Sequence, residues 1–127
     1  MRIARIRMLY SFLLLGLLQV ISCNNNSSDR NVALINDFHR KFIDSITPVD
    51  GKSYTTYYIR ITGYANDSIR IIPGLEEHGF YSFYFKDSID EELKSDYYGT
   101  FPRHITFDPY KATDGNLKIE YRLLGGY

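Results

Sequence analysis

The C-terminal part of the chain alternates between apolar and polar residues with a period of two, and this pattern constrains the fold most strongly. Residues 117–123 read Leu-Lys-Ile-Glu-Tyr-Arg-Leu. Because successive side chains of a strand point to opposite faces, the alternation predicts a strand with one apolar and one polar side. The predicted inward set is Leu117, Ile119, Tyr121 and Leu123. Such a strand belongs to an antiparallel sheet with one buried face and one wet face.

Four further segments carry strand-like patterns with a heavy apolar or aromatic face. They are residues 53–62, 68–72, 80–86 and 104–108. The predicted inward residues are Tyr57, Ile59 and Ile61 in the first, Tyr81, Phe83 and Phe85 in the third, and Ile105 and Phe107 in the fourth. Turn-forming residues, Gly63 and Asn66 among them, predict a turn between the first two strands, because both types tolerate positive φ.

The residues before these strands predict a helix. Ile35, Phe38, Phe42 and Ile46 recur at spacings of three, four and four, which places them on one stripe of a helix over Asn31–Ile46. Residues 88–91, Ser-Ile-Asp-Glu, match a capping box and predict one or two helical turns within 88–96. The predicted fold is therefore α+β: one N-terminal helix packed on a roughly five-stranded antiparallel sheet, a cystatin-like architecture.

The N-terminal residues have the three parts of an export signal. Residues 1–7 carry three arginines and no acid, residues 8–18 are largely apolar, and residues 20–23 read Val-Ile-Ser-Cys. This stretch resembles a bacterial lipoprotein signal peptide, although Val20 stands where Leu is usual. The resemblance implies cleavage after Ser22 and acylation of Cys23, the chain's one cysteine. Two alternatives are an uncleaved anchor, for which the apolar run is short of the roughly 20 residues needed, and secretion with a free thiol.

The resemblance divides the chain into a signal peptide over 1–22, a lipidated flexible tether over 23–30 and a single domain over 31–127. The lipid would hold the protein on its membrane, and Asn24, in place of the Asp that retains enteric lipoproteins, favours the outer membrane over the inner one. Without Arg2, Arg5 and Arg7 the 15 basic residues fall to 12 against 15 acidic ones, a net charge of −3. This charge and the lack of a basic cluster disfavour nucleic acid as a partner.

The chain carries few residues arranged for catalysis. The histidines at 39, 78 and 104 lack metal-ligand spacing, and no motif indicates a cofactor. The strongest candidate for acid–base chemistry is the run Glu76-Glu77-His78, which a solvated loop also explains. We therefore predict a protein that is not an enzyme, with a small hydrolase using this loop as the alternative.

The tripeptide Asp-Ser-Ile occurs three times, with its serines at Ser45, Ser68 and Ser88. It resembles the acceptor signal of a periplasmic O-glycosylation system of some Gram-negative bacteria. The resemblance implies glycosylation at one or more of these serines. The alternative is that Asp and Ser are simply frequent at the boundaries of structural elements.

The anchor and a tyrosine-rich sheet face predict a lipoprotein with a small binding domain and a protein partner. The predicted binding face consists of Tyr58, Arg60, Tyr84 and Arg122 on the outer side of the sheet. Tyr and Arg dominate many protein interfaces because they combine a large contact area with hydrogen-bonding groups. A second hypothesis in this class is an immunity or inhibitor lipoprotein directed against a toxin or an envelope hydrolase.

Overall fold

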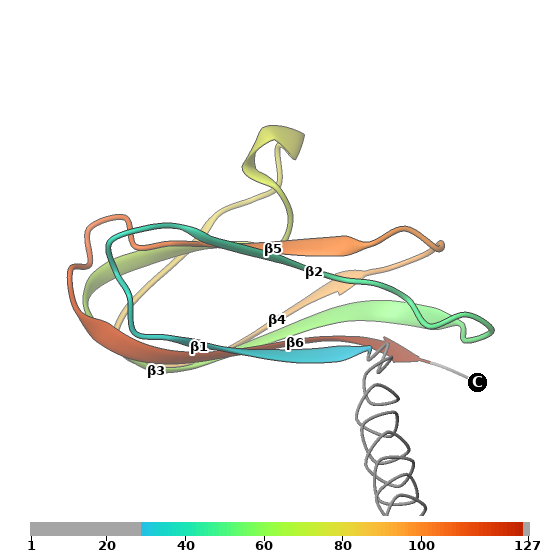
Figure 1. Ribbon diagram of the computed structural model, residues 1–127, viewed down its shortest axis with the longest axis horizontal. Helices are drawn as coiled ribbons and strands as arrows, with labels where there is room; N and C mark the ends of the chain where they lie inside the picture. Colours follow the sequence, from blue (N-terminus) through green and yellow to red (C-terminus); the bar gives the residue numbers. More distant parts are fainter. Residues whose placement is uncertain (1–28, 126–127) are drawn as a thin grey trace, which may run out of the picture.

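The computed structural model describes residues 29–125, which form a nearly all-β domain (Figure 1). The strands are β1 (Arg30–Ile35), β2 (Phe42–Ile46), β3 (Tyr54–Ile72), β4 (Phe83–Asp96), β5 (Arg103–Asp108) and β6 (Gly115–Gly125), with a short 3₁₀ helix, η2 (Glu76–His78). All pairings are antiparallel, in the order β1-β6-β3-β5-β2, and β4 pairs with the other side of β3. None of the described residues forms a helix of seven or more residues, so the predicted α+β fold and its cystatin-like helix are wrong.

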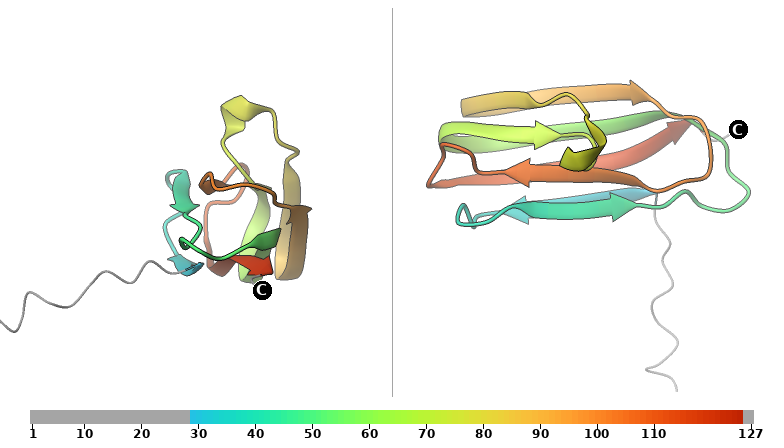
Figure 2. Two further views of the ribbon diagram at one scale, coloured as in Figure 1. Left: turned by 90° about the vertical axis from the view of Figure 1, so that its right-hand side faces the viewer. Right: turned by 90° about the horizontal axis from the view of Figure 1, so that it is seen from above.

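The sheet curls into two facing layers because β3 changes its partner along its length. Residues 54–65 of β3 pair with β6, whereas residues 70–72 pair with β5. The first layer therefore contains β1, β6 and the start of β3, and the second contains β2, β5 and the end of β3 (Figures 1 and 2). The result is a nearly closed, jelly-roll-like sheet with its core between the layers. Within residues 29–125, no helix has the length and apolar character needed to cross a membrane.

A bend inside β3 replaces the turn predicted at residues 63–67. Gly63 has a φ of 131°, and a Cβ there would lie 2.1 Å from the carbonyl oxygen of Asn116 on β6, so glycine is required for the close approach. A bulge between Ala65 and Ile69 then turns β3 toward the second layer. The side chain of Asn66 fixes this corner by donating to Thr113 Oγ1 at 2.8 Å. The turn-forming residues thus bend one long strand and do not separate two.

The predicted helix over 31–46 is two short strands joined by a loop. In β1, Ala33 and Ile35 point inward while Leu34 is 76% exposed, which is a period of two. The loop is shaped by Asp37, whose carboxylate accepts from the backbone N–H of His39 at 2.9 Å. Pairing with β6 and with β5 outweighs the helical spacing of the apolar residues.

The predicted helical turns within 88–96 are also wrong, because these residues form the second part of β4. Ile89 is buried and Leu93 packs against the core, while the acidic residues between them stay exposed. Asp87, with a φ of 63°, marks the place where β4 turns from one layer to the other. A capping box requires a free helix N-terminus, and here β3 pairs with the segment and keeps it extended.

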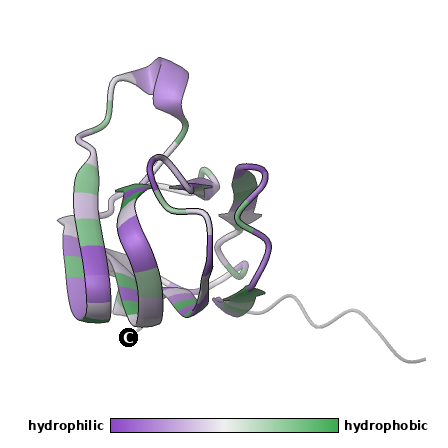
Figure 3. Ribbon diagram, turned by 90° about the vertical axis from the view of Figure 1, so that its left-hand side faces the viewer, coloured by the Kyte–Doolittle hydropathy of each residue, from purple (hydrophilic) through white to green (hydrophobic). Residues whose placement is uncertain are grey.

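Most predicted inward faces are confirmed, and their alternation with polar residues is visible along the strands in Figure 3. The confirmed residues are Tyr57, Ile59, Ile61, Ile105, Phe107, Leu117, Ile119, Tyr121 and Leu123. The third predicted strand differs, since Phe83 is 37% exposed and Tyr81, outside β4, is 88% exposed. Phe83 lies opposite Ile71 and shares its side of the sheet, but β4 lies at the margin of the sheet and covers it incompletely.

Candidate functional site

The structure brings three of the four residues of the predicted binding face together on the outer side of the first layer. Tyr58 of β3 lies opposite Arg122 of β6 and Lys94 of β4. The guanidinium of Arg122 lies over the Tyr58 ring at 4.6 Å, and the Tyr58 hydroxyl donates to Glu92 at 2.8 Å. Burial and this carboxylate raise the pKa of Tyr58. Tyr58 is only 5% exposed, so the prediction that it is open to a partner is wrong.

Of the other two residues of that face, Arg60 shares this surface and Tyr84 does not. Arg60 is exposed and forms an ion pair with Asp90 at 3.1 Å. Tyr84 lies opposite Arg70 in the second layer, with its ring 5.2 Å from that of Tyr110. Tyr84 therefore does not join the other three, because the bend in β3 carries it to a different surface.

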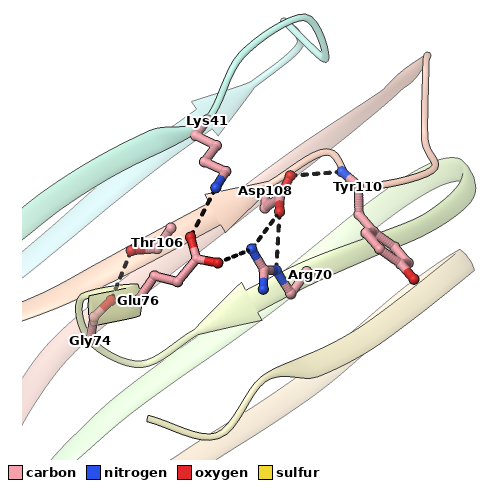
Figure 4. Close-up of polar contacts among 7 residues, drawn as sticks. All are labelled: Lys41, Arg70, Gly74, Glu76, Thr106, Asp108 and Tyr110. Carbon is pink, nitrogen blue, oxygen red and sulfur yellow. Dashed lines mark hydrogen bonds and ion pairs between the residues drawn. The ribbon is translucent and has the colours of Figure 1, made fainter. Parts of the chain in front are cut away.

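The loop that holds Glu76 is attached to the second layer by a polar network (Figure 4). The Glu76 carboxylate accepts from Lys41 at 2.9 Å and from Arg70 at 2.8 Å, and Arg70 also pairs with Asp108 at 2.8 Å. Lys41 and Arg70 lower the pKa of Glu76. A general acid at neutral pH needs the opposite shift. The network therefore anchors the loop, and Glu76 is not prepared for proton donation.

The neighbouring residues of η2 add nothing to a catalytic site. Glu77 and His78 are both exposed. In the described part of the chain, no three His, Cys, Asp or Glu side chains are grouped so that they could hold a metal ion. The hydrolase alternative thus lacks a supporting geometry at this loop.

The predicted modification sites occupy different positions. Ser88 is exposed on β4, whereas Ser45 on β2 and Ser68 on β3 are half-buried within strands. Among the three serines, Ser88 is the most accessible to a glycosylating enzyme. The predicted lipidation site, Cys23, lies outside the described residues.

A cleft opens between the two layers on the side of β4 and has a volume of about 540 Å³. Its apolar wall comes from inward residues of β3 and β4 and from the loop after Pro73; these include Tyr57, Ile59, Phe80, Phe83 and Leu93. Ser95 and Arg103 supply polar groups, and Glu92, Lys94 and Asp96 also contribute to the lining. Cavities of this size and composition commonly hold small organic ligands.

Arg103, the first residue of β5, is the distinctive group of this cleft. It is 8% exposed, and its guanidinium lies over the Tyr57 ring at 4.6 Å and over the Phe80 ring at 5.4 Å. Within the described part of the chain it donates only to backbone carbonyls, those of Pro73 at 3.1 Å and Asp96 at 3.5 Å. Burial lowers the pKa of Arg103, although the group stays charged. No carboxylate within residues 29–125 forms an ion pair with Arg103, which is rare for a buried charge.

The cleft also contains a buried hydroxyl without a hydrogen-bond partner among the described residues. The hydroxyl oxygen of Ser95 is buried and makes no hydrogen bond within the described residues. Ser95 lies directly opposite Tyr57 in the β3–β4 pairing, and the Tyr57 ring carries the Arg103 guanidinium. The unpartnered Ser95 hydroxyl and the Arg103 cation, which has no carboxylate partner within residues 29–125, are therefore grouped around one aromatic ring.

The sequence contained a signal for Arg103. Arg103, Ile105 and Phe107 occupy alternate positions, so the inward direction of Ile105 and Phe107 also places Arg103 inward. A charged residue at the inward position of a strand is a candidate functional group. Ser95 gave no such signal, because its segment was predicted to be helical.

Comparisons with known proteins give no family. No protein-family model matches the chain, and no curated protein matches it. Among solved structures, a de novo designed double-stranded β-helix has 14% identity and a TM-score of 0.42, covering 75% of this chain and 97% of its own. A family 29 carbohydrate-binding module has 14% identity and a TM-score of 0.36, with coverages of 74% and 66%. The Tobacco streak virus coat protein has 11% identity and a TM-score of 0.38, with coverages of 83% and 90%. Similarities this weak carry no conclusion about function.

Proposed function

We propose that the protein is a non-enzymatic binding protein of the bacterial cell envelope, held to its membrane by lipid on Cys23, and that its cleft between the sheet layers is the ligand site. The resemblance of residues 1–23 to a lipoprotein signal peptide supports the anchor. The observation that most supports a binding site in the cleft is Arg103. It is buried among aromatic side chains and forms no ion pair with a carboxylate of residues 29–125.

The geometry favours binding over hydrolysis because the groups of the cleft suit recognition. An arginine keeps its proton at any physiological pH, so it serves as a fixed charge and donor and does not act as a base. In the run that the sequence favours for acid–base work, Glu76-Glu77-His78, the Glu76 carboxylate is held by Lys41 and Arg70. Aromatic walls with a few polar groups are the usual composition of a small-molecule site.

The anchor is tested by Cys23→Ala. This change removes the acyl acceptor, so we expect an unprocessed precursor and no incorporation of a fatty-acid analogue, measured by labelling and by intact mass. Normal processing and labelling of the variant would contradict lipidation of Cys23.

Glycosylation is tested by the intact mass of the mature wild-type protein. A mass equal to polypeptide plus lipid would exclude sugar at Ser45, Ser68 and Ser88.

The binding site is tested by filling the cleft. The full chain, purified in detergent, is incubated with a small-molecule extract of the envelope, and the retained compounds are compared by mass spectrometry. We expect Leu93→Trp to lose compounds that the wild type retains, since Leu93 lines the cleft. Leu34→Trp is the matched control, because Leu34 is exposed on β1 and distant in sequence from the lining residues. Retention that is equal in both variants would contradict the proposal.

A further inference from the structure

We infer that the ligand of the cleft is a small organic monoanion, a carboxylate on a planar or apolar body, whose charged group is bound by Arg103 and whose body lies against the aromatic wall. This inference rests on the proposed function, because it assigns a chemical class to the ligand of the same cleft.

The missing counter-ion points to an anion. A buried charge in a protein is normally paired, because desolvation without a partner is costly. Arg70, whose side chain is 18% exposed, follows this rule, since it pairs with Asp108 and with the exposed Glu76. Arg103 is less exposed than the Arg70 side chain, yet it contacts only carbonyls and aromatic rings. An anionic ligand would supply the partner that residues 29–125 do not provide.

The donors indicate a carboxylate. A guanidinium carries five N–H groups, and the two bonds to Pro73 and Asp96 use two of them. The remaining donors lie in the guanidinium plane, where a planar carboxylate can accept two parallel hydrogen bonds. The unpartnered Ser95 hydroxyl, opposite Tyr57, is placed to donate a further bond to the same group.

The charge of the lining indicates a single negative charge. Glu92 and Lys94 contact Tyr58 on the outer face, and Asp96 shares their side of β4 by alternation. Among the described lining residues, Arg103 is therefore the charged side chain that faces into the cleft. A dianion such as a phosphate monoester would keep one charge without a partner there, whereas a monoanion is balanced by Arg103 alone.

The rest of the ligand is indicated by the walls. Phe80 and Phe83 are partly exposed at the cleft, and Tyr57, Ile59 and Leu93 line it with carbon. A ring or chain bound there would cover these side chains and gain hydrophobic and stacking energy. The volume of about 540 Å³ suits a molecule of drug size or smaller.

The test uses acid and amide pairs of the same shape, in which an NH₂ donor replaces a charged acceptor oxygen: indole-3-acetate with indole-3-acetamide, and 4-phenylbutyrate with 4-phenylbutanamide. Binding to the full chain is measured by equilibrium dialysis against a matched detergent blank, at up to millimolar concentration. We expect each acid to bind at least about tenfold more tightly than its amide, the ratio that one charge-assisted hydrogen bond supplies. Ser95→Ala should weaken the acid by a smaller factor.

Variants assign the preference to the arginine. Arg103→Met should abolish the preference for the acid, and Arg103→Lys, which keeps the charge but loses the planar fork, should retain it in reduced form. Arg60→Met, at an exposed arginine paired with Asp90, is the matched control and should leave it unchanged. If Arg103→Met does not fold, the role of Arg103 is judged from Arg103→Lys, whose preference for the acid should be smaller than that of the wild type.

The outcomes separate the two proposals. Equal binding of acid and amide, abolished by Leu93→Trp, would overturn the monoanion assignment and leave the cleft as the ligand site. Absence of binding by every probe, or binding that Leu93→Trp does not change, would overturn the cleft itself as the site. A preference for the acid that survives Arg103→Lys and Arg103→Met equally would overturn the role of Arg103.

Discussion

Two arginines lie over two neighbouring tyrosines at the same distance, 4.6 Å, on opposite sides of β3. Arg122 covers Tyr58 on the outer face, and Arg103 covers Tyr57 between the layers. On the outer face Nε of Arg122 lies 3.8 Å from the carboxylate of Glu120, too far for a hydrogen bond but close enough to balance charge. Between the layers Arg103 has no such carboxylate among residues 29–125. The same pair of residue types thus has a carboxylate beside its cation on the outer face, although Arg122 Nε makes no hydrogen bond among the described residues, and has no such carboxylate between the layers.

This contrast shows why the predicted binding face and the structural candidate differ. A sheet face dense in Tyr, Arg and acids satisfies its own charges across strands, so its residue types alone do not indicate a partner. A buried charge without an opposite charge indicates a ligand more strongly, because its desolvation lowers the stability of the protein when no ligand is bound. Proteins tolerate such costs at functional sites.

The largest expected difference concerns the two tyrosines. Tyr57→Ala removes a side chain that is 1% exposed and donates to the carbonyl of His104 at 2.9 Å, so the unfolding free energy should fall by about 3–5 kcal/mol. Tyr58→Ala removes a ring covered only by surface side chains and should cost about 1–2 kcal/mol. Urea unfolding measures both. Equal losses would show that the two sides of β3 are not core and surface.

For the two arginines we expect the reverse order: the buried Arg103 should contribute less to the free energy of unfolding than Arg122 on the outer face. Arg103→Met exchanges an unbalanced buried cation for an apolar side chain, so the unfolding free energy without ligand should stay within about 1 kcal/mol of the wild type. Arg122→Met loses contacts with Tyr58 and Glu120 and should lower the stability by about 1 kcal/mol. Thermal unfolding at fixed pH gives the comparison. A loss above about 3 kcal/mol for Arg103→Met would identify Arg103 as a structural residue.

The smallest expected effect is a dependence on pH through the loop that carries Phe80. Because Lys41 and Arg70 lower the pKa of Glu76, its contribution to stability is present above the ordinary value of 4.5 and is lost as the pH falls through the lowered pKa. Below pH 4.5 the melting temperature of the wild type should therefore decrease more than that of Glu76→Gln. Glu77→Gln is the control and should behave as the wild type does. Parallel curves for all three proteins would mean that the network in Figure 4 does not hold the loop.

The sequence predicted local strands better than it predicted their arrangement. The alternation at residues 117–123 and 104–108 was sufficient, because the inward residues of β5 and β6 are fully buried. The helix over 31–46 was wrong because Ile35, Phe38, Phe42 and Ile46 satisfy a helical spacing although they belong to two strands and a loop. Whether such a segment forms a helix or strands depends on strand partners that are distant in the sequence, such as β6 for β1.

The candidate site was predictable only in part. The inward position of Arg103 follows from the alternation with Ile105 and Phe107. That no carboxylate of residues 29–125 pairs with it depends on how β3 and β4 turn between the layers, which the isolated residues do not specify. The burial of Tyr58 likewise depends on Lys94, from a segment whose strand character the capping-box pattern concealed.

The most direct test of the central claim compares the two arginines in one spectrum. Side-chain Nε–H resonances of Arg103 and Arg122 are assigned in the full chain by the substitutions Arg103→Lys and Arg122→Lys, and indole-3-acetate is then added. If the cleft binds a carboxylate through its unbalanced cation, the Arg103 resonance shifts in a saturable manner while that of Arg122 stays in place, and indole-3-acetamide moves neither to the same extent. A shift of Arg122 with an unchanged Arg103 would contradict the account and return the ligand to the outer face.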